Sequence, residues 1–282
     1  MSHSEVFTMR RGKVVKFKIH TWLKDNLDIM VEARRGNLNF NGLTSGDGKT
    51  RTGKTTITIQ EACYVDHTFL DNWKTRIIYD WDELIEVCNK LKPGQAVIYD
   101  EARDVLNSAN SMSRYCQKLL TFFSRVGSKN LFIFVVLPDF FDLPKSLAIV
   151  QSHFLINVYF RNGFQRGFFN FFNDNQKKYL YIMGKKFLDY NAAKPSFKGT
   201  FTNFFPLNYT TYEAHKQEAF KRVEAKKKKR IIESPRVIKY KDQIRVLVKY
   251  TMEKENKTQK EMGQMIGVTQ KTIGNYLSNV GK

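Results

Sequence analysis

Residues 48–55 read Gly48-Lys49-Thr50-Arg51-Thr52-Gly53-Lys54-Thr55, and this stretch decides the fold that we expect for the chain. It matches the pattern G-x-x-x-x-G-K-[ST], whose glycines let the backbone curl around phosphate groups and point N–H groups at them. Another Gly-Lys-Thr begins at Gly48 itself, but the position five residues earlier is Leu43, so that copy lacks the opening glycine. The alternative to a phosphate-binding loop is a surface turn rich in Gly, Lys and Thr.

The residues after this stretch favour the phosphate-binding loop. Residues 56–62 are typical of the start of a helix, and a helix N-terminus attracts anions. The residues before it are less typical, because 36–43 alternates between polar and apolar residues where a buried strand is expected. We expect ATP to be bound by the loop and the first residues of the helix, namely Gly48, Lys49, Thr50, Arg51, Thr52, Gly53, Lys54, Thr55 and Thr56.

A site that hydrolyses a nucleotide also needs a ligand for Mg²⁺ and a group that activates water. Both are expected at the end of a second buried strand, and the apolar run 96–99 is followed directly by Asp100 and Glu101. We expect Thr55 and Asp100 to hold Mg²⁺ and Glu101 to orient and polarise the attacking water, and we count Lys54 among the catalytic residues. The alternative is a strand that leads into an N-capped helix.

The order of the segments predicts an α/β fold, in which a mostly parallel sheet carries helices on both faces. Apolar runs and helical patterns alternate along the chain, with turn residues between them. We expect strands at 75–79, 130–137 and 154–160, and helices at 81–91, 113–123 and 147–151.

The loop, the Asp-Glu strand and the apolar strand after it resemble the additional-strand P-loop ATPases, in particular the FtsK–HerA superfamily. Within this superfamily the layout is similar to the zonula-occludens-toxin-like and viral packaging ATPases, over about residues 30–160. The resemblance implies a ring, usually of six subunits, that moves DNA by using ATP. It also implies an arginine finger that reaches a neighbour's nucleotide. We prefer Arg125 for that role, and the alternative is an ordinary surface arginine.

Two features depart from the pattern of that superfamily. The strand after Asp-Glu ends in Leu137-Pro138-Asp139, where many members carry a polar sensor, often Gln. The toxin-like phage proteins often carry a membrane span, and here the longest apolar run, 131–137, is too short to cross a membrane.

Composition favours a globular protein that meets a polyanion. The 282 residues are 42% hydrophobic, and the formal net charge is +20 with a pI of about 9.8. So basic a chain usually meets nucleic acid or an anionic membrane face. Residues 221–282 hold 17 Lys and Arg against six Asp and Glu, so this segment supplies +11 of the net charge of +20.

The cysteines and the N-terminus indicate the compartment. Cys63, Cys88 and Cys116 are odd in number and far apart, so they predict neither a disulfide framework nor a zinc site. No signal peptide precedes the fold pattern. We expect a soluble cytoplasmic protein without a membrane partner, located in the host cytoplasm if it is viral.

The segment 158–186 interleaves aromatic and basic residues. Asn162-Gly163 and Asn173-Asp174-Asn175 predict turns between aromatic strands. Aromatic rings beside cations could grip single-stranded DNA by stacking. The alternative is that the rings pack on the edge of the sheet, because strands favour aromatic residues in any case.

The C-terminal residues predict a small helical domain that binds DNA. Thr258 and Glu261 form a capping box, Gly267 marks a turn, and Thr269 caps another helix, so the stretch resembles a helix-turn-helix. The residues expected to contact DNA are Gln270, Lys271 and Asn275 in the last helix and Lys227, Lys228 and Lys229 in a basic run. The alternatives are a helical protein-binding module and, for the basic run, a solvated linker or helix face.

The chain is thus expected to divide into five parts: an N-terminal segment (1–29), a P-loop ATPase core (30–160), an aromatic β-hairpin extension (161–205), a basic linker (206–240) and a helix-turn-helix domain (241–282). The leading function is a DNA-dependent ATPase, either a translocase or a genome-packaging motor of a virus or mobile element. It would act on double-stranded DNA with Mg-ATP as a homo-oligomer, and the resemblance implies a hexameric ring. The alternatives are a nucleotide-gated DNA-binding regulator or replication initiator, and a phage-type assembly or secretion ATPase.

Overall fold

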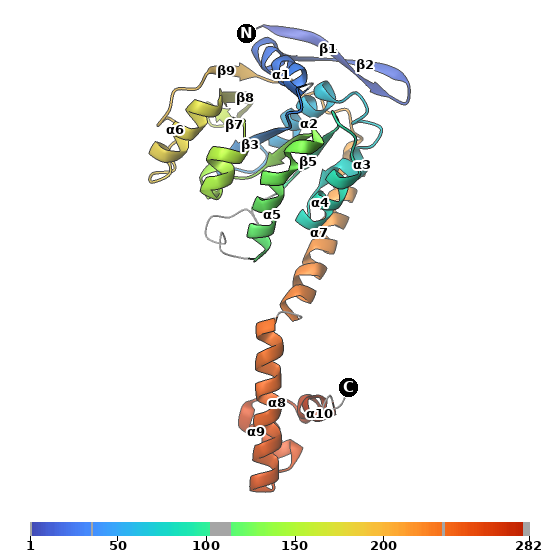
Figure 1. Cartoon of the computed structure of the whole chain (residues 1–282), viewed down its shortest axis with the longest axis vertical. Helices are drawn as coiled ribbons and strands as arrows, with labels where there is room; N and C mark the ends of the chain where they lie inside the picture. The colour runs from blue at the N-terminus through green and yellow to red at the C-terminus, as the bar shows by residue number, and fades with distance from the viewer. Residues whose placement is uncertain (1, 35, 102–113, 233–234, 279–282) are drawn as a thin grey trace. The chain divides into compact units, whose positions relative to one another are not determined.

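The strand that precedes the phosphate-binding loop lies in the middle of a seven-stranded sheet, in a computed structural model that describes residues 2–34, 36–101, 114–232 and 235–278. The strand order is β4-β5-β6-β3-β7-β8-β9 (Figure 1). The strands are β3 Phe40–Gly46, β4 Ile77–Ile78, β5 Ala96–Tyr99, β6 Phe132–Val136, β7 Phe154–Arg161, β8 Gln165–Phe172 and β9 Phe197–Thr200.

The sheet is mostly parallel, as expected for an α/β fold. The pairs β4–β5, β5–β6, β6–β3 and β3–β7 are parallel, and only β8 and β9 run antiparallel to their neighbours. One strand, β6, lies between the loop strand β3 and the Asp-Glu strand β5. The predicted fold class is confirmed.

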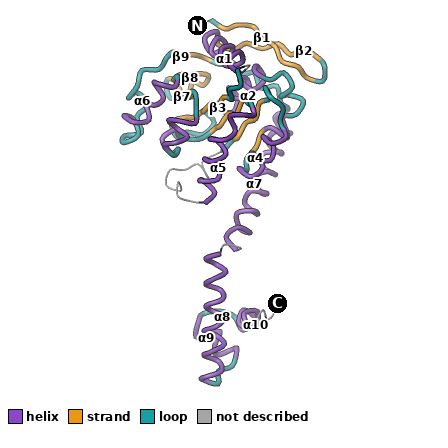
Figure 2. The backbone as a smooth tube through the Cα atoms, viewed as in Figure 1, coloured by secondary structure: helices purple, strands orange, loops and turns teal. Residues whose placement is uncertain are grey.

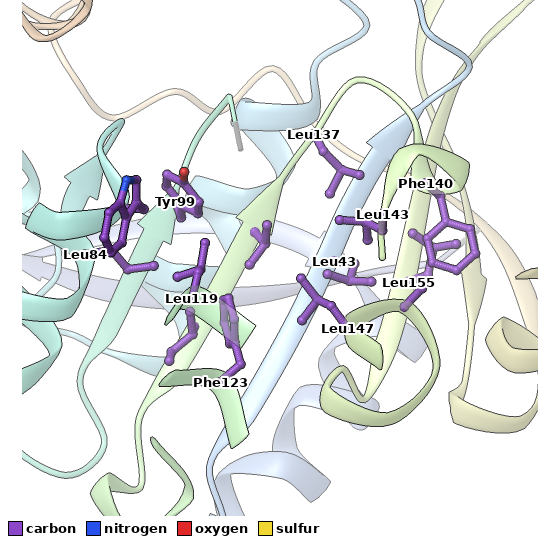
Figure 3. Close-up of a cluster of buried hydrophobic side chains, with 14 of the residues drawn as sticks. Leu43, Leu84, Tyr99, Leu119, Phe123, Leu137, Phe140, Leu143, Leu147 and Leu155 are labelled. Atoms are coloured by element: carbon purple, nitrogen blue, oxygen red, sulfur yellow. The ribbon is translucent and has the colours of Figure 1, made fainter. Parts of the chain in front are cut away.

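Helices cover both faces of this sheet (Figure 2). One face carries α4 (Trp81–Lys90), α5 (Arg114–Arg125), α6 (Asp174–Gly184) and the short turns η4 (Phe140–Asp142) and η5 (Ser146–Gln151). Their apolar side chains pack on Leu43, Val97, Val135 and Leu155 of the sheet (Figure 3). The cluster is fully buried, so the strands that hold the loop and the Asp-Glu pair share one rigid core.

The other face carries α2 (Lys54–Val65), which begins directly after the loop. Its Thr58 hydroxyl donates to Thr44 of β3 at 3.0 Å, so the helix is fixed to the strand that precedes it. Beyond α2 lie α1 (Thr21–Arg34) and a two-stranded ribbon of β1 (His3–Arg10) and β2 (Lys13–His20). The N-terminal segment is therefore part of the layer that covers the sheet.

Several expected elements are confirmed, and one is wrong in extent. The helices and strands expected at 81–91, 130–137, 147–151 and 154–160 are present within a few residues, and α5 covers the described part of the helix expected at 113–123. The strand expected at 75–79 is only two residues long, because Trp73–Arg76 forms a helical turn, α3. The loop strand is buried over most of its length, because its alternating residues face helices on both sides.

The turn expected at Asn173-Asp174-Asn175 is wrong. Asn173 caps α6, with its side chain accepting from the Gln176 N–H at 3.0 Å, and the Gln176 side chain accepts from the Asn173 N–H in return. Asn is a strong helix-capping residue as well as a turn residue, which explains the misreading. Tyr179 and Tyr181 therefore lie on a helix and not on a strand.

A buried lysine joins α6 to the end of η5. Lys177 is fully buried, and its ammonium donates to the carbonyl oxygen and the hydroxyl of Ser152, with Asp174 Oδ1 at 3.2 Å. Burial lowers the pKa of Lys177 to about 8.

The stability of the wild type should therefore rise with pH relative to Lys177→Met. Between about pH 8 and 10.5 the unfolded chain holds a proton on Lys177 that the folded chain has lost, so higher pH favours folding by up to about 3 kcal/mol. Urea unfolding of both proteins at pH 7, 8.5 and 10 measures the difference. Lys194→Met, at an exposed position, should show no such trend, and a constant difference for Lys177→Met would contradict the expectation.

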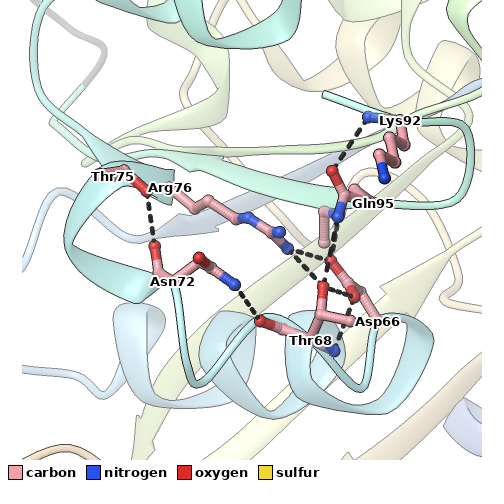
Figure 4. Close-up of polar contacts among 8 residues, drawn as sticks. Asp66, Thr68, Asn72, Thr75, Arg76, Lys92 and Gln95 are labelled. Carbon is pink, nitrogen blue, oxygen red and sulfur yellow. Dashed lines mark hydrogen bonds and ion pairs between the residues drawn. The ribbon is translucent and has the colours of Figure 1, made fainter. Parts of the chain in front are cut away.

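The end of α2 is held against the start of β5 by a buried ion pair (Figure 4). Asp66 accepts from the Arg76 guanidinium, from the Ala96 N–H at 2.9 Å and from the Thr68 N–H and hydroxyl at 2.8 and 2.7 Å. The side chains of Asp66 and Arg76 are only 4% and 5% exposed. This contact fixes the helix that begins at the loop relative to the strand that ends at Asp100.

The chain divides into two compact units, Met1–Ala219 and Phe220–Lys282. Residues 209–232 form one helix, α7 (Tyr209–Ile232), where a basic linker was expected over 206–240. The helix forms because no proline or glycine interrupts a run rich in Ala, Glu, Lys and Arg. Pro235 is the first residue of α8 (Pro235–Glu255), a position that proline favours.

The second unit contains three helices around a small core. Val248 of α8 packs with Met262 of α9 (Gln259–Ile266) and Ile273 of α10 (Gln270–Ser278). The capping box of Thr258 and Glu261 is present, and Gly267 ends α9 in the left-handed conformation with φ 70°. Within the described part of the chain, none of the helices is both long and apolar enough to span a bilayer.

Candidate functional site

The predicted phosphate-binding loop connects the carboxyl end of β3 to the first residue of α2. Three of its residues have positive φ, namely Gly48 at 70°, Arg51 at 57° and Gly53 at 101°. A side chain at Gly53 would also place its Cβ 2.7 Å from the Phe201 ring. Glycine is therefore required there both by the backbone and by the neighbouring segment.

The loop is anchored to the end of β6. The N–H groups of Gly46 and Gly48 both donate to the Pro138 carbonyl, at 3.1 and 3.2 Å. Below them, the Tyr190 hydroxyl lies 3.0 Å from the Gly46 carbonyl oxygen and 2.9 Å from Asp139 Oδ1. Pro138, in the segment where this chain lacks the polar sensor of the superfamily, thus supports the loop through its backbone carbonyl.

Lys54 lies inside the loop. Its ammonium donates to the Lys49 carbonyl at 2.8 Å, and burial lowers its pKa. A cation held there faces the space that the loop encloses, which is the arrangement needed to bind phosphate oxygens. The predicted loop residues that line the resulting cleft are Lys49, Thr50, Arg51, Thr52, Gly53, Lys54, Thr55 and Thr56.

The two predicted carboxylates come to the same cleft from the end of β5. Asp100 is 1% exposed, and its Oδ2 accepts from the Thr55 hydroxyl at 3.3 Å. Burial raises the pKa of Asp100, and the charge of Lys216 opposes that effect. Glu101 is exposed, and it has a positive φ of 58°, a strained conformation of the kind found at functional sites.

These groups fit a magnesium ion. A threonine hydroxyl and a carboxylate are hard oxygen ligands, and Mg²⁺ usually takes one or two protein ligands together with phosphates and waters. Among the described residues, no cluster of three or more His, Cys, Asp or Glu side chains could hold a metal ion by itself. A metal at Thr55 and Asp100 would therefore need further oxygen ligands, such as those of a nucleotide.

The first turns of α7 contribute side chains that the sequence analysis missed. Lys216 Nζ lies 3.3 Å from Glu101 Oε1 and 3.8 Å from Asp100 Oδ2, and the Tyr212 hydroxyl lies 3.4 Å from the same Asp100 oxygen. Burial lowers the pKa of Lys216, but Asp100 and Glu101 outweigh burial and raise it. In the sequence, the only sign of these residues is their four-residue spacing on one helical face.

The cleft has a volume of about 750 Å³ and two different walls. Lysine, arginine and threonine side chains form the side at the loop, and the Asp-Glu pair lies with them. Apolar and aromatic side chains form most of the remainder: they are Val136, Leu137, Pro138, Phe205, Leu207, Tyr209 and Tyr212. The charged side chains of Arg166, Glu213 and Lys216 complete the lining. Such a cleft could hold a polyphosphate at one end and a flat ring at the other.

Arg125 does not lie with these residues. It is exposed at the end of α5, which leads through the turn η3 (Val126–Lys129) to the amino-terminal start of β6. The loop follows the carboxyl end of β3, which runs parallel to β6, so the two sites are at opposite edges of the sheet. A role toward a neighbour's nucleotide remains a prediction.

Most aromatic residues of the segment 158–186 are not available for stacking on bases. Phe168, Phe169, Phe171 and Phe172 are buried, and so is Tyr181 on α6. The rings instead pack on one another, as Phe171 does against Phe197 at a centroid distance of 4.7 Å. This packing agrees with the alternative stated for the segment, in which the rings pack on the sheet and do not stack on DNA bases. Phe164, at the tip of the β7–β8 hairpin, is 91% exposed.

The residues expected to contact DNA lie on two helices. Gln270, Lys271 and Asn275 are exposed on α10, where Lys271 and Asn275 are four residues apart and so share one face. Lys227, Lys228 and Lys229 lie in the last turns of α7, and their side chains are outside the described part of the structure.

Comparison with known proteins gives fold-level likeness only. No protein-family profile matches the sequence, and no curated protein matches it. Among solved structures, the N-terminal domain of zonular occludens toxin from Neisseria meningitidis is similar at 14% identity and a TM-score of 0.38, over 62% of this chain and 98% of that one. The genome packaging NTPase B204 from Sulfolobus turreted icosahedral virus 2, in complex with ATP-gammaS, is similar at 14% identity and a TM-score of 0.34, over 49% of this chain and 94% of that one.

A third similar structure is B204, the DNA-packaging ATPase from Sulfolobus Turreted Icosahedral Virus, at 11% identity and a TM-score of 0.27, over 53% of this chain and 84% of that one. These identities and TM-scores are low, so the chemistry of the cleft has to be argued from its own residues. What those residues form is a P-loop α/β unit with an Asp-Glu pair beside the loop.

Proposed function

We propose that this protein is a Mg²⁺-dependent ATPase that acts on DNA. The observation that carries the proposal is the convergence of Lys54, Thr55, Asp100 and Glu101 on one cleft, although 45 residues separate Thr55 from Asp100. A surface turn rich in Gly, Lys and Thr would not place a buried carboxylate 3.3 Å from a threonine hydroxyl.

The residues of the cleft divide the chemistry of hydrolysis between them. The loop N–H groups and Lys54 would bind the phosphates, and Thr55 and Asp100 would hold Mg²⁺. When bound, the metal would neutralise the charge that develops on the phosphate oxygens. Glu101 would orient a water molecule toward the terminal phosphorus and accept its proton as the bond to the bridging oxygen breaks and ADP leaves.

Action on DNA is supported by charge and by the second unit. Residues 220–282 carry a strong positive charge, which gives electrostatic, sequence-independent affinity for a phosphate backbone. The helices α9 and α10, joined by the turn at Gly267, have the lengths and capping of a helix-turn-helix, with α10 in the place of the helix that enters the major groove. We propose a translocase or genome-packaging motor that assembles as a homo-oligomer on double-stranded DNA.

A second candidate is a regulator or replication initiator in which ATP controls DNA binding. The helix α7 favours this candidate. Its first turns contribute Tyr212 and Lys216 to the cleft, and the basic run lies further along the same helix. A phage-type assembly or secretion ATPase is a third candidate, with no observation that favours it over the other two.

The rate of ATP hydrolysis by the full chain, with and without long double-stranded DNA, tests the proposal. A motor should hydrolyse ATP faster as the DNA becomes longer, because each subunit consumes ATP while it moves. A slow rate that does not respond to DNA, with tight binding to one sequence, would favour the regulator. Absence of both ATP binding and hydrolysis would overturn the proposal as a whole.

Replacing Lys271 and Asn275 together by alanine should remove sequence preference in DNA binding. A side chain that reads a base edge contributes about 1–3 kcal/mol of discrimination. Selection of binding sites from random duplexes by the wild type and the variant measures this effect, and basal ATP hydrolysis without DNA should not change. The control is Lys239→Ala, an exposed charge on α8, and unchanged preference in the double variant would remove α10 as the reading helix.

A further inference from the structure

Two cations that line the cleft, Arg166 and Lys216, come from neither the loop nor the Asp-Glu strand, and Lys216 contacts the Asp-Glu pair. The ammonium of Lys216 lies between Asp100 and Glu101, at 3.8 and 3.3 Å from their nearer oxygens, and its side chain is only 19% exposed. The proposed reaction needs Asp100 to hold the metal and Glu101 to activate water. In this structure Lys216 forms ion pairs with both carboxylates.

The Asp100 oxygen that faces Lys216 is also the one that faces the metal position. Asp100 Oδ2 is 3.3 Å from the Thr55 hydroxyl, 3.4 Å from the Tyr212 hydroxyl and 3.8 Å from Lys216 Nζ. A divalent cation at Thr55 and Asp100 would repel the ammonium, because like charges at such distances in a partly buried site interact strongly. The terminal phosphate of a nucleotide in the same cleft would attract it.

The backbone of α7 is fixed at this point, whereas the lysine side chain can move. Tyr212 is 4% exposed, and its ring packs against Phe205 and Trp73 at centroid distances of 5.3 and 6.2 Å. Lysine carries its charge on a flexible four-carbon stem. The ammonium can therefore change partners within the cleft while the helix stays in place.

We propose that Lys216 is a catalytic residue that exchanges the Asp100–Glu101 pair for the terminal phosphate of ATP. The inference deepens the proposed ATPase function and rests on it. Before ATP binds, Lys216 neutralises the two carboxylates. With Mg-ATP in the cleft, its ammonium contacts the terminal phosphate and stabilises the negative charge that grows there as the bond to the bridging oxygen breaks.

The exchange also links water activation to the presence of substrate. Glu101 accepts a proton from water only when its carboxylate no longer pairs with Lys216, and that happens when a terminal phosphate is present to take the lysine. Lys216 itself donates no proton. ADP lacks the phosphate that would draw the lysine away, so the protein with metal-free ADP bound keeps the original pair.

The test compares Lys216→Ala, Lys216→Met and Lys216→Arg with Lys221→Ala, which removes an exposed lysine from the same helix. In Lys216→Ala we expect kcat to fall roughly 10²–10³-fold, as when one donor to a developing oxyanion is removed. The Kd for ADP, measured without a divalent cation, should not change, because no contact to ADP is lost. Lys216→Arg should recover part of kcat, and Lys221→Ala should match the wild type.

A readout independent of turnover is the affinity of the nucleotide-free protein for Mn²⁺, followed by electron paramagnetic resonance. Without the competing ammonium, Lys216→Ala and Lys216→Met should bind Mn²⁺ more tightly than the wild type does. Lys216→Met keeps most of the stem, so it serves if the alanine variant fails to fold.

The outcomes separate this inference from the proposed function. If the wild type neither binds nor hydrolyses ATP, the proposed function fails. If the wild type hydrolyses ATP and Lys216→Ala does so equally well or faster, Lys216 only pairs with the two carboxylates and has no catalytic role. This inference then fails, and the proposed function stands. Unchanged Mn²⁺ affinity in both variants would also overturn it.

Discussion

Glu101→Gln should leave ATP bound and lower the rate of its hydrolysis by roughly 10²–10⁴-fold, the usual contribution of a general base. Glutamine keeps the shape of glutamate but cannot accept the proton of the attacking water. Glu101 is not expected to contact the phosphates, so the Kd for ATP should stay within about threefold of the wild-type value. Single-turnover hydrolysis and equilibrium binding of a fluorescent ATP analogue measure the two quantities.

Two variants complete this experiment. Lys54→Ala removes the cation that the loop holds, so it should weaken ATP binding at least tenfold, or about 1.4 kcal/mol. Glu86→Gln, on the exposed side of α4, makes the same chemical change far from the cleft and should behave as the wild type. If Glu101→Gln retained full activity, the base would have to be sought elsewhere in the cleft.

Arg76→Met should destabilise the first unit by about 3–5 kcal/mol, because it leaves the Asp66 carboxylate buried without its counter-charge. Asp66 is 4% exposed at its side chain, so water cannot replace the guanidinium without opening the structure. Urea unfolding monitored by tryptophan fluorescence measures the change, since Trp73 and Trp81 both lie in this unit.

The double variant Asp66→Asn/Arg76→Met shows whether the uncompensated charge is the cause. Asparagine carries no charge, so the double variant should be more stable than Arg76→Met alone, although its one carbonyl oxygen can accept from only one of the Ala96 and Thr68 N–H groups, which bind different oxygens of Asp66. Lys74→Met, an exposed cation on the same short helix, should change stability by less than about 1 kcal/mol. Equal losses in the single and double variants would show that packing around Arg76, and not charge, sets the cost.

The sequence predicts those parts of the fold that produce a recognisable pattern within a short contiguous stretch of residues. The loop from Gly48 to Thr55 and the apolar run before Asp100 each carry their signal within eight residues, and the structure brings them together. Their convergence could be expected because both follow strands of one parallel sheet, and the carboxyl ends of such strands meet at one edge.

The parts that the sequence does not predict depend on contacts between distant residues. Lys216 and Asp100 are 116 positions apart, and no local pattern distinguishes Lys216 from the other lysines of α7. Asn173 was misread because the same residue type favours turns and helix starts, and only the helix that follows decides between them. The N-terminal ribbon was missed although the alternation around Arg11-Gly12 could have revealed it.

The two ends of the central sheet limit how copies of this chain can associate. One edge strand, β4, has two residues, and the other, β9, has four; beside β9 the His3 ring lies 3.0 Å from the Thr200 carbonyl oxygen. A strand from another molecule would find few free backbone groups to pair with at either edge. A ring built from this protein would therefore be held by contacts other than continuation of the central sheet from subunit to subunit, and such contacts can separate and re-form during a catalytic cycle without breaking hydrogen bonds of that sheet.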